Sequence, residues 1–163
     1  MLAPPRPLAS DRLHHARLLA LGVPLALLGG ALLSEYVGKL YPCEMCWWQR
    51  YPHAIAILLA IGALLQPLSA PRTRVLTLLA ALAIAASGAI GVFHAGVEYG
   101  WWEGLTTCTS SGATSLEDIM AVRLVRCDQV QWALAGISLA GFNALFSLGG
   151  ALLIVLFAQR RAA

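Results

Sequence analysis

Four long apolar stretches constrain what this chain can fold into more than any other feature of its sequence. They cover residues 18–33, 47–65, 75–97 and 132–157. Each approaches or exceeds the ~20 residues that an α-helix needs to cross a bilayer core. Hydrophobic residues make up 59% of the 163 residues and charged residues only 12%, about half the charged share of a soluble domain. The sequence therefore predicts an all-α membrane protein, an antiparallel bundle of four transmembrane helices.

These stretches divide a single transmembrane domain, residues 1–163, into helices and connections. Residues 1–17 are basic and rich in proline, which predicts a cytoplasmic tail. Residues 98–131 form the only long polar loop. Within it, residues 115–124 start with a serine followed by acidic residues, and apolar residues recur there at near-helical spacing. This pattern predicts a short amphipathic helix on the membrane surface, or else a loop helix packed on protein.

The distribution of lysine and arginine orients the predicted bundle. With four spans, both termini and the short turn at residues 66–74 lie on one side of the membrane, and cytoplasmic segments are enriched in lysine and arginine. We therefore expect both termini in the cytoplasm and all cysteines in the periplasm, an oxidising compartment, with the chain in a bacterial inner membrane. The basic residues on the predicted cytoplasmic side are Arg6, Arg12, Arg17, Arg72, Arg74, Arg160 and Arg161.

Two cysteines stand at the outward start of the second apolar stretch, in the sequence Cys43-Glu44-Met45-Cys46. Pro42 disfavours helical backbone in the residue before it, so the helix should begin close to Cys46. Backbone N–H groups at a helix N-terminus favour the thiolate form of a cysteine, which is the nucleophile. The pair therefore indicates dithiol redox chemistry, with a structural zinc site as the alternative.

Two basic side chains should lie at the depth of Cys46. Arg50 follows Cys46 by about one helical turn, and a charge within a span costs about 2.5–3.5 kcal/mol on insertion scales, so it usually has a function. Arg50 could stabilise a Cys46 thiolate and a reduced, anionic electron carrier, or it could extend to the lipid headgroups. His94, one turn before Glu98, could donate a hydrogen bond to such a carrier, or be structural only.

A second cysteine pair, Cys108 and Cys127, lies in the long loop. Four cysteines allow three pairings, of which Cys43–Cys46 together with Cys108–Cys127 is the simplest. A disulfide in an exposed loop exchanges readily, although it could also be a plain staple. One cysteine pair at the start of an apolar stretch and a second pair in a polar loop together indicate an electron relay. The alternative is a metal-binding membrane protein that uses the cysteines with His94, and we expect no nucleic-acid partner.

In these residues the chain resembles the bacterial disulfide bond formation protein B (DsbB) family. The resemblance rests on the sequence Cys-Glu-Met-Cys-Trp-Trp-Gln-Arg at residues 43–50, on the second cysteine pair and on the four spans. It also includes Arg126-Cys127-Asp128 followed by Trp132 and Gly136. The vitamin K epoxide reductase family has a similar bundle, but its loop cysteines precede its Cys-x-x-Cys pair.

The resemblance implies a protein-disulfide oxidoreductase that depends on a quinone, either ubiquinone or menaquinone, from the membrane quinone pool. A reduced periplasmic thioredoxin-fold oxidase of the DsbA type would attack Cys108, and Cys127 would then attack Cys43. Cys46 would be released as a thiolate beside the quinone, and the electrons would leave as quinol. By the same resemblance, the quinone contacts are Cys46, Arg50 and His94.

Overall fold

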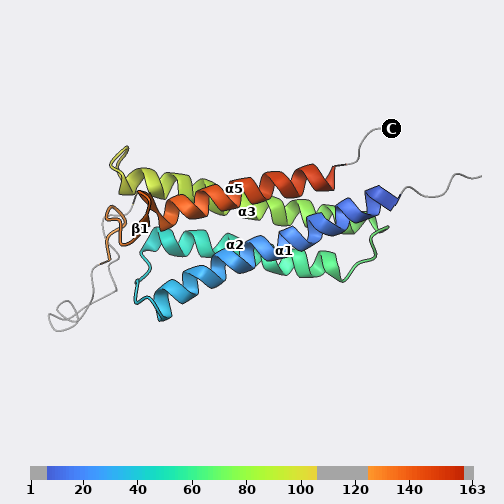
Figure 1. Ribbon diagram of the computed structural model, residues 1–163, viewed down its shortest axis with the longest axis horizontal. Helices are drawn as coiled ribbons and strands as arrows, with labels where there is room; N and C mark the ends of the chain where they lie inside the picture. Colours follow the sequence, from blue (N-terminus) through green and yellow to red (C-terminus); the bar gives the residue numbers. More distant parts are fainter. Residues whose placement is uncertain (1–6, 106–124, 160–163) are drawn as a thin grey trace, which may run out of the picture.

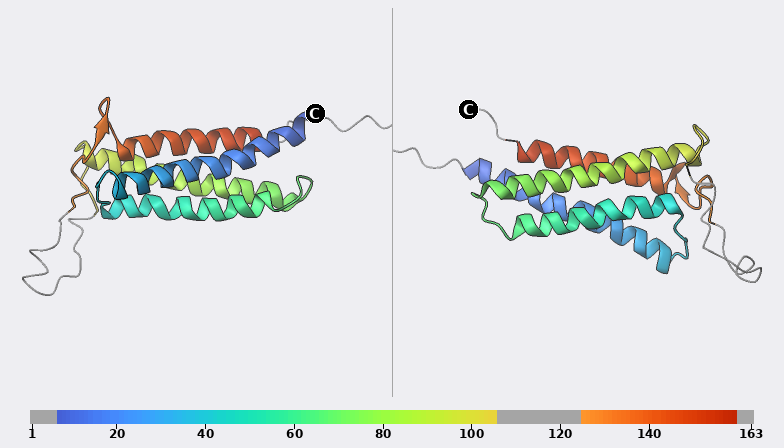
Figure 2. Two further views of the ribbon diagram at one scale, coloured as in Figure 1. Left: turned by 60° about the horizontal axis from the view of Figure 1, so that its bottom comes forward. Right: turned by 180° about the vertical axis from the view of Figure 1, so that it is seen from behind.

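The computed structural model describes residues 7–105 and 125–159, and four long helices in it lie side by side with alternating direction (Figure 1). The helices are α1 (Pro7–Tyr36), α2 (Glu44–Leu64), α3 (Pro71–Glu98) and α5 (Leu139–Ala158). Helix α3 packs on α2 and α5, and α1 packs on the same two helices, so α1 and α3 lie at opposite corners (Figure 2). The described residues are mostly helical, in agreement with the all-α prediction.

Small side chains fill the space between the helices, whereas large apolar side chains cover the outside. Alanines with no exposed surface are Ala16, Ala20, Ala56, Ala60, Ala63 and Ala80. Leucines that are more than half exposed include Leu58, Leu65, Leu82, Leu145 and Leu152. Small residues allow helices to approach closely in lipid, and an apolar outer surface is at home there. This distribution is the one expected of helices that are surrounded by lipid.

Three of the helices are long and apolar enough to cross a membrane. They are α1 over Asp11–Tyr36, α3 over Pro71–Glu98 and α5 over Leu139–Ala158. Helix α2 has 21 residues but is more polar, because it carries Gln49, Arg50 and His53. These three side chains are buried between the helices. Length and composition therefore support three of the four predicted spans within the described residues.

The fourth helix begins later than the sequence predicted. Residues 132–157 were expected to form one apolar span, but α5 starts at Leu139. An antiparallel hairpin of β1 (Ala133–Leu134) and β2 (Ile137–Ser138) precedes it. Positive φ angles at Ala135 (51°) and Gly136 (79°) form the two-residue turn, a conformation that glycine adopts without strain. The first residues of the predicted span therefore form a β-hairpin directly before α5.

The hairpin is attached to the end of α3. The Tyr99 hydroxyl donates a hydrogen bond to Gly136 O (3.0 Å) and accepts one from Ser138 N (2.8 Å). Ser138 in turn caps α5, because its Oγ accepts a hydrogen bond from Gly141 N at 3.1 Å. These bonds hold the start of α5 beside the end of α3.

Trp102 folds back over the last turns of α3. Its indole N–H donates to Phe93 O at 2.8 Å, and its ring stacks on the ring of Phe93. A Cβ atom at Gly96 would lie 2.0 Å from the indole, so only glycine leaves room for this contact. The start of the loop that follows α3 is therefore fixed to the helix.

Most of residues 1–17, the segment predicted to be a cytoplasmic tail, is helical, because α1 begins at Pro7. Arginine side chains stabilise the other helices from this segment: Arg12 Nη2 donates to Leu156 O at 2.7 Å, and Arg17 Nη2 donates to Leu64 O at 2.6 Å. Carbonyl groups in the last turn of a helix have no partner within the helix, so both arginines act as C-terminal caps. The predicted surface helix at residues 115–124 lies outside the described residues.

Substitution of Arg17 by methionine should lower the stability of the protein by about 1.5–3 kcal/mol, because Leu64 O then loses a charged donor. The measurement is thermal unfolding in detergent. Arg72→Met is the matched control, since Arg72 is exposed and should change stability by less than about 0.5 kcal/mol. Equal effects of the two substitutions would contradict the assigned role of Arg17.

Candidate functional site

The first turn of α2 brings Cys43 and Cys46 together. Cys43 is the N-cap residue, and its sulfur accepts a hydrogen bond from Cys46 N at 3.4 Å. The Cys43 thiol donates to the Cys46 sulfur at 3.2 Å. Cys43 is 1% exposed, whereas Cys46 is partly exposed. Donation from Cys43 places negative charge on Cys46 when the pair is reduced, so Cys46 is the accessible nucleophile of the pair.

Cys127 lies beside Cys43, although 84 positions separate them along the sequence. Cys127 is buried in one cluster with Cys43, Met45 and Val97 and makes a hydrogen bond with the Cys43 side chain. The backbone after Cys127 is tied to the same place, because Gln131 Nε2 donates to Tyr41 O at 2.9 Å. Three of the four cysteines predicted to be catalytic therefore lie together. The fourth, Cys108, lies outside the described residues.

Hydrogen bonds with Cys127 and with Cys46, together with burial, raise the pKa of the Cys43 thiol above its ordinary value of 9.0. The reduced, folded protein should therefore keep this proton at pH values where the unfolded chain has lost it. Stability from this group is complete below about pH 9 and is lost as the pH rises further. We expect the thermal midpoint of the reduced protein to fall between about pH 8 and about pH 10 more steeply than that of Cys43→Ser. Parallel curves for the two proteins would contradict this expectation.

His94 approaches the cysteine pair from α3. Its Nε2 lies 3.5 Å from Cys43 Sγ and 3.8 Å from Glu98 Oε1. Glu98 in turn accepts a hydrogen bond from the Ser138 hydroxyl. His94 is 2% exposed, so its ring is fixed between the helices. The histidine predicted to lie at the depth of Cys46 thus contacts the buried sulfur of the pair.

Arg50 makes an ion pair that sequence reasoning missed. Its Nη1 donates to Glu35 Oε2 at 2.5 Å and its Nη2 donates to Ala31 O at 3.3 Å, both on α1. The guanidinium also lies 4.8 Å from the centroid of the Trp47 ring. The side chains of Arg50 and Glu35 are only 9% and 16% exposed. The only signal in the sequence was a carboxylate at the end of an apolar stretch, where a charge needs a partner.

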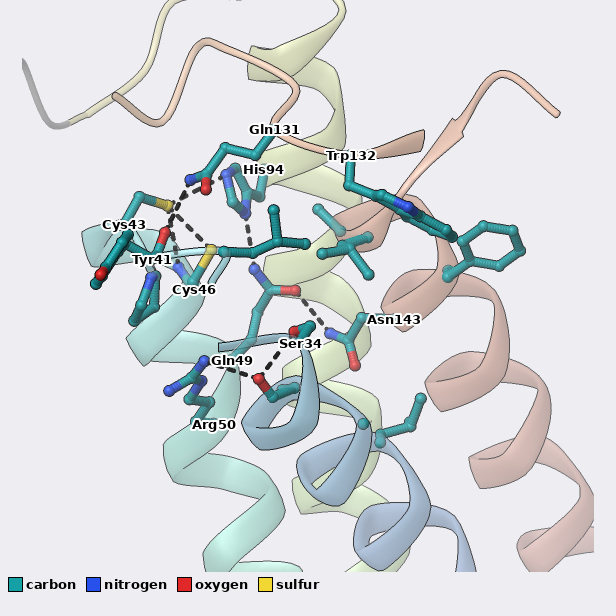
Figure 3. A pocket seen from close by; sticks show the side chains of 18 of the residues that line it. Ser34, Tyr41, Cys43, Cys46, Gln49, Arg50, His94, Gln131, Trp132 and Asn143 are labelled. Carbon is teal, nitrogen blue, oxygen red and sulfur yellow. Dashed lines mark hydrogen bonds between the residues drawn. The ribbon is translucent and has the colours of Figure 1, made fainter. Parts of the chain in front are cut away.

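One cavity of about 250 Å³ connects these groups (Figure 3). Cys43, Cys46, Arg50 and His94 all line it. Three further polar side chains from α2 and α5 line it and were not among the predicted site residues: Gln49, His53 and Asn143. Gln49 and His53 lie four residues apart on one face of α2. The sequence gives no sign that Asn143 meets them, because Asn143 reaches the site through the packing of α5 on α3.

An apolar groove between α1 and α5 adjoins the cavity. Ala26 and Leu27 line both of them. The groove has a volume of about 530 Å³, and its remaining lining residues are Val23, Leu145, Phe146, Gly149, Gly150 and Leu153. The cavity with its charged and polar groups thus continues into a lining of apolar side chains and glycine.

Comparison with known proteins identifies the family. Residues 13–157 match the family described as disulfide bond formation protein DsbB. The chain belongs to this family. The family expected from the Cys-x-x-Cys motif and its surroundings is therefore confirmed.

Two curated relatives of the DsbB family are similar over part of their length. Both are named disulfide bond formation protein B, from Shewanella sp. strains MR-4 and MR-7, and each is 37% identical over 87 residues. The matched segment is 52% of this chain and 47% of each relative, so the chain spans about half the length of the relatives it matches. No solved structure matches the chain.

Proposed function

We propose that this protein is a membrane thiol oxidase that accepts electrons from a reduced periplasmic thioredoxin-fold protein of the DsbA type and passes them to a quinone. The observation that carries the proposal is the cavity in which Cys46, Arg50 and His94 meet beside the buried sulfur of Cys43. A dithiol next to a cation and a hydrogen-bond donor can transfer two electrons to a quinone and stabilise the anionic oxygen that results. Membership of the DsbB family supports the same chemistry.

The relay begins in the long loop, at Cys108. A partner thiolate attacks the Cys108–Cys127 disulfide at Cys108, which forms a mixed disulfide and frees Cys127. Cys127 attacks Cys43, the Cys43–Cys46 bond breaks, and its electron pair stays on Cys46 as a thiolate. The burial of Cys127 next to Cys43 supports this exchange.

The second half of the cycle restores both disulfides. The second thiol of the partner releases Cys108, which attacks Cys127 and frees Cys43 as a thiolate. Cys43 and Cys46 then form their disulfide again, and two electrons and two protons convert the quinone to quinol. Partner dithiol and quinone are consumed, and partner disulfide and quinol are produced, so atoms and electrons balance.

The quinone is a substrate of this site, and its two parts suit two regions of the protein. Its polar ring suits the cavity, where Arg50 is held by Glu35 and Ala31 O. Its apolar tail suits the groove between α1 and α5, which continues from the cavity. Ubiquinone and menaquinone both have a polar ring and an apolar tail, so both belong to the proposed substrate class.

The proposed topology is that all four helices cross a bacterial inner membrane, with both termini in the cytoplasm and the cysteines in the periplasm. Helix α2 takes part because its outer face is apolar, with Ile55 and Leu58 53% and 71% exposed, although its inner face is polar. The basic cluster of Arg12 and Arg17 caps the ends of α5 and α2 that are far from the cysteines (Figure 1). That charge distribution supports a cytoplasmic location for this end.

The test is quinone reduction by the purified protein in detergent. Reduced thioredoxin-fold oxidase and a quinone are added, and the quinone absorbance is followed for the wild type and for Cys108→Ser. Catalytic turnover in the wild type that is lost in Cys108→Ser is the expected result. Turnover that survives in Cys108→Ser would overturn the loop mechanism, and no turnover with any reduced partner would overturn the proposed function.

Metal binding is the second candidate function, and one observation favours it. The ligand atoms of Cys43, Cys46 and His94 all lie within 4.8 Å of one another. Two thiolates and an imidazole are a donor set that suits Zn²⁺. Zinc that remains stoichiometrically bound after dialysis of the reduced protein, together with no quinone turnover, would favour this candidate over the thiol oxidase.

A further inference from the structure

A row of buried and partly buried polar side chains runs from the cysteine pair into the space between the helices. It is formed by His94 on α3, Gln49 and His53 on α2, and Asn143 on α5. Figure 3 shows His94, Gln49 and Asn143 of this row. His94, Gln49 and His53 are 2%, 7% and 3% exposed. Polar groups in such surroundings are costly without partners, so their hydrogen bonds must be consistent with one another.

Each member of the row is joined to the next by a short contact. The His53 Nε2 atom lies 2.9 Å from Asn143 Oδ1, and Asn143 Nδ2 lies 2.8 Å from Gln49 Oε1. Gln49 Nε2 lies 2.8 Å from His94 Nδ1. The last step is the contact of 3.5 Å between His94 Nε2 and Cys43 Sγ. Four contacts thus connect His53 with a sulfur of the redox pair.

Two backbone carbonyl groups determine the direction in which the amides of the row donate. Gln49 Nε2 also lies 3.1 Å from Met45 O, and Asn143 Nδ2 also lies 3.2 Å from Ser87 O. A carbonyl oxygen only accepts hydrogen bonds, so the NH₂ group of each amide must face it. The reverse orientation of either amide would place two oxygen atoms against each other. Gln49 therefore donates to His94, and Asn143 donates to Gln49.

This direction decides which nitrogen of neutral His94 carries the proton. Because Gln49 Nε2 can only donate, His94 Nδ1 must accept, and the ring proton is on Nε2. Nε2 is the nitrogen that faces Cys43 Sγ and Glu98, and the His94 ring also makes a hydrogen bond with the backbone of Cys127. We propose that Gln49 and Asn143 are positioning residues that hold His94 in the Nε2–H tautomer, with its N–H directed at the sulfur of Cys43.

The inference deepens the proposed function, and its kinetic consequence rests on that function. In the relay, Cys43 leaves as a thiolate when Cys108 attacks Cys127, and the electron pair of the Cys43–Cys127 bond stays on Cys43 Sγ. An N–H group directed at this sulfur stabilises the leaving thiolate, and charge-assisted hydrogen bonds are about twice as strong as neutral ones. The opposite tautomer would present a lone pair to the sulfur and would repel the charge.

The experiment is ¹⁵N NMR of the full-length protein labelled in histidine, with the thiols reduced and the protein in detergent at a pH where His94 is neutral. The His94 signals are assigned by their loss in His94→Gln. The expected result is a protonated Nε2 and an unprotonated Nδ1. A wild-type spectrum with the proton on Nδ1 would overturn the proposal.

Asn143→Leu tests the remote end of the row. Leucine resembles asparagine in shape but leaves Gln49 Oε1 without its donor, so the Gln49 amide is less strongly oriented. We expect signals of the Nδ1–H tautomer to appear and quinone reduction to slow about five- to tenfold, the range that one ordinary hydrogen bond controls. The control is Ser147→Ala on the same helix. Ser147 donates to the oxygen of Asn143, which keeps His53 as a donor, and its hydroxyl also lies 3.5 Å from His53 Nε2. Among the described residues it makes no bond to the Asn143 nitrogen that donates to Gln49.

The two readouts separate this inference from the proposed function. An unchanged His94 tautomer in Asn143→Leu would overturn the positioning role, whatever the activity of the variant. A shift of the tautomer in Ser147→Ala as large as in Asn143→Leu would overturn it too. Absence of quinone reduction in the wild type would overturn the proposed function, while the NMR result would still decide the tautomer.

Discussion

Substitution of Cys46 by serine is expected to reduce quinone reduction to the rate without protein. Cys46 is the accessible sulfur of the pair and lines the cavity with Arg50, whereas Cys43 is buried. Serine keeps the size of the side chain but cannot form the Cys43–Cys46 disulfide or carry its electrons to the quinone. The measurement is the change in quinone absorbance with a reduced thioredoxin-fold partner in excess.

Ser34→Ala is the matched control for this variant. Ser34 lines the same cavity, and among the described residues its hydroxyl bonds only to Ala31 O of its own helix. It should retain turnover within about twofold, since such local bonds contribute little net free energy. Turnover in Cys46→Ser at the level of Ser34→Ala would mean that the electrons leave the protein by a route without Cys46.

The second large effect is expected at the ion pair of Arg50 and Glu35. Arg50→Met should lower the free energy of unfolding by about 3–5 kcal/mol, because it leaves the Glu35 carboxylate without its partner in a buried place. It should also raise the quinone concentration needed for half-maximal rate, since the cation that faces the cavity is lost. Thermal unfolding in detergent and quinone titration measure the two effects.

A double variant separates the structural role of this pair from its role in catalysis. Arg50→Met combined with Glu35→Gln removes the unpaired charge, so we expect most of the stability to return. Quinone reduction should stay low, because the guanidinium is still absent. Recovery of both stability and activity in the double variant would show that Arg50 serves only to neutralise Glu35.

The parts of this protein that could be predicted from sequence are those that depend on residues close together along the chain. Apolar stretches indicated the helices, and the Cys-x-x-Cys motif next to Pro42 indicated a cysteine in the first turn of α2. The start of α5 was misplaced because residues 132–138 are as apolar as a helix, and only Gly136 signals the turn.

What could not be predicted depends on contacts between helices. Glu35 meets Arg50 only because α1 packs on α2, and Asn143 meets Gln49 across 94 positions. Neither pair has a spacing that reveals it, since each depends on the rotation of two helices against one another. The same holds for Cys127, whose contact with Cys43 requires the segment after the long loop to return to the start of α2.

The attachment of Trp102 to the end of α3 limits how far Cys108 can lie from the helix bundle. Trp102 is fixed against Gly96, and Cys108 follows it by six residues. Six residues extend at most about 20 Å, so the chain length allows Cys108 to lie no farther than that from Trp102. In the proposed relay, the partner must therefore bring its own thiol within this distance of Trp102. If the proposed relay operates, the position of Trp102 thus limits the partner to proteins whose active thiol is exposed enough to reach this end of the bundle.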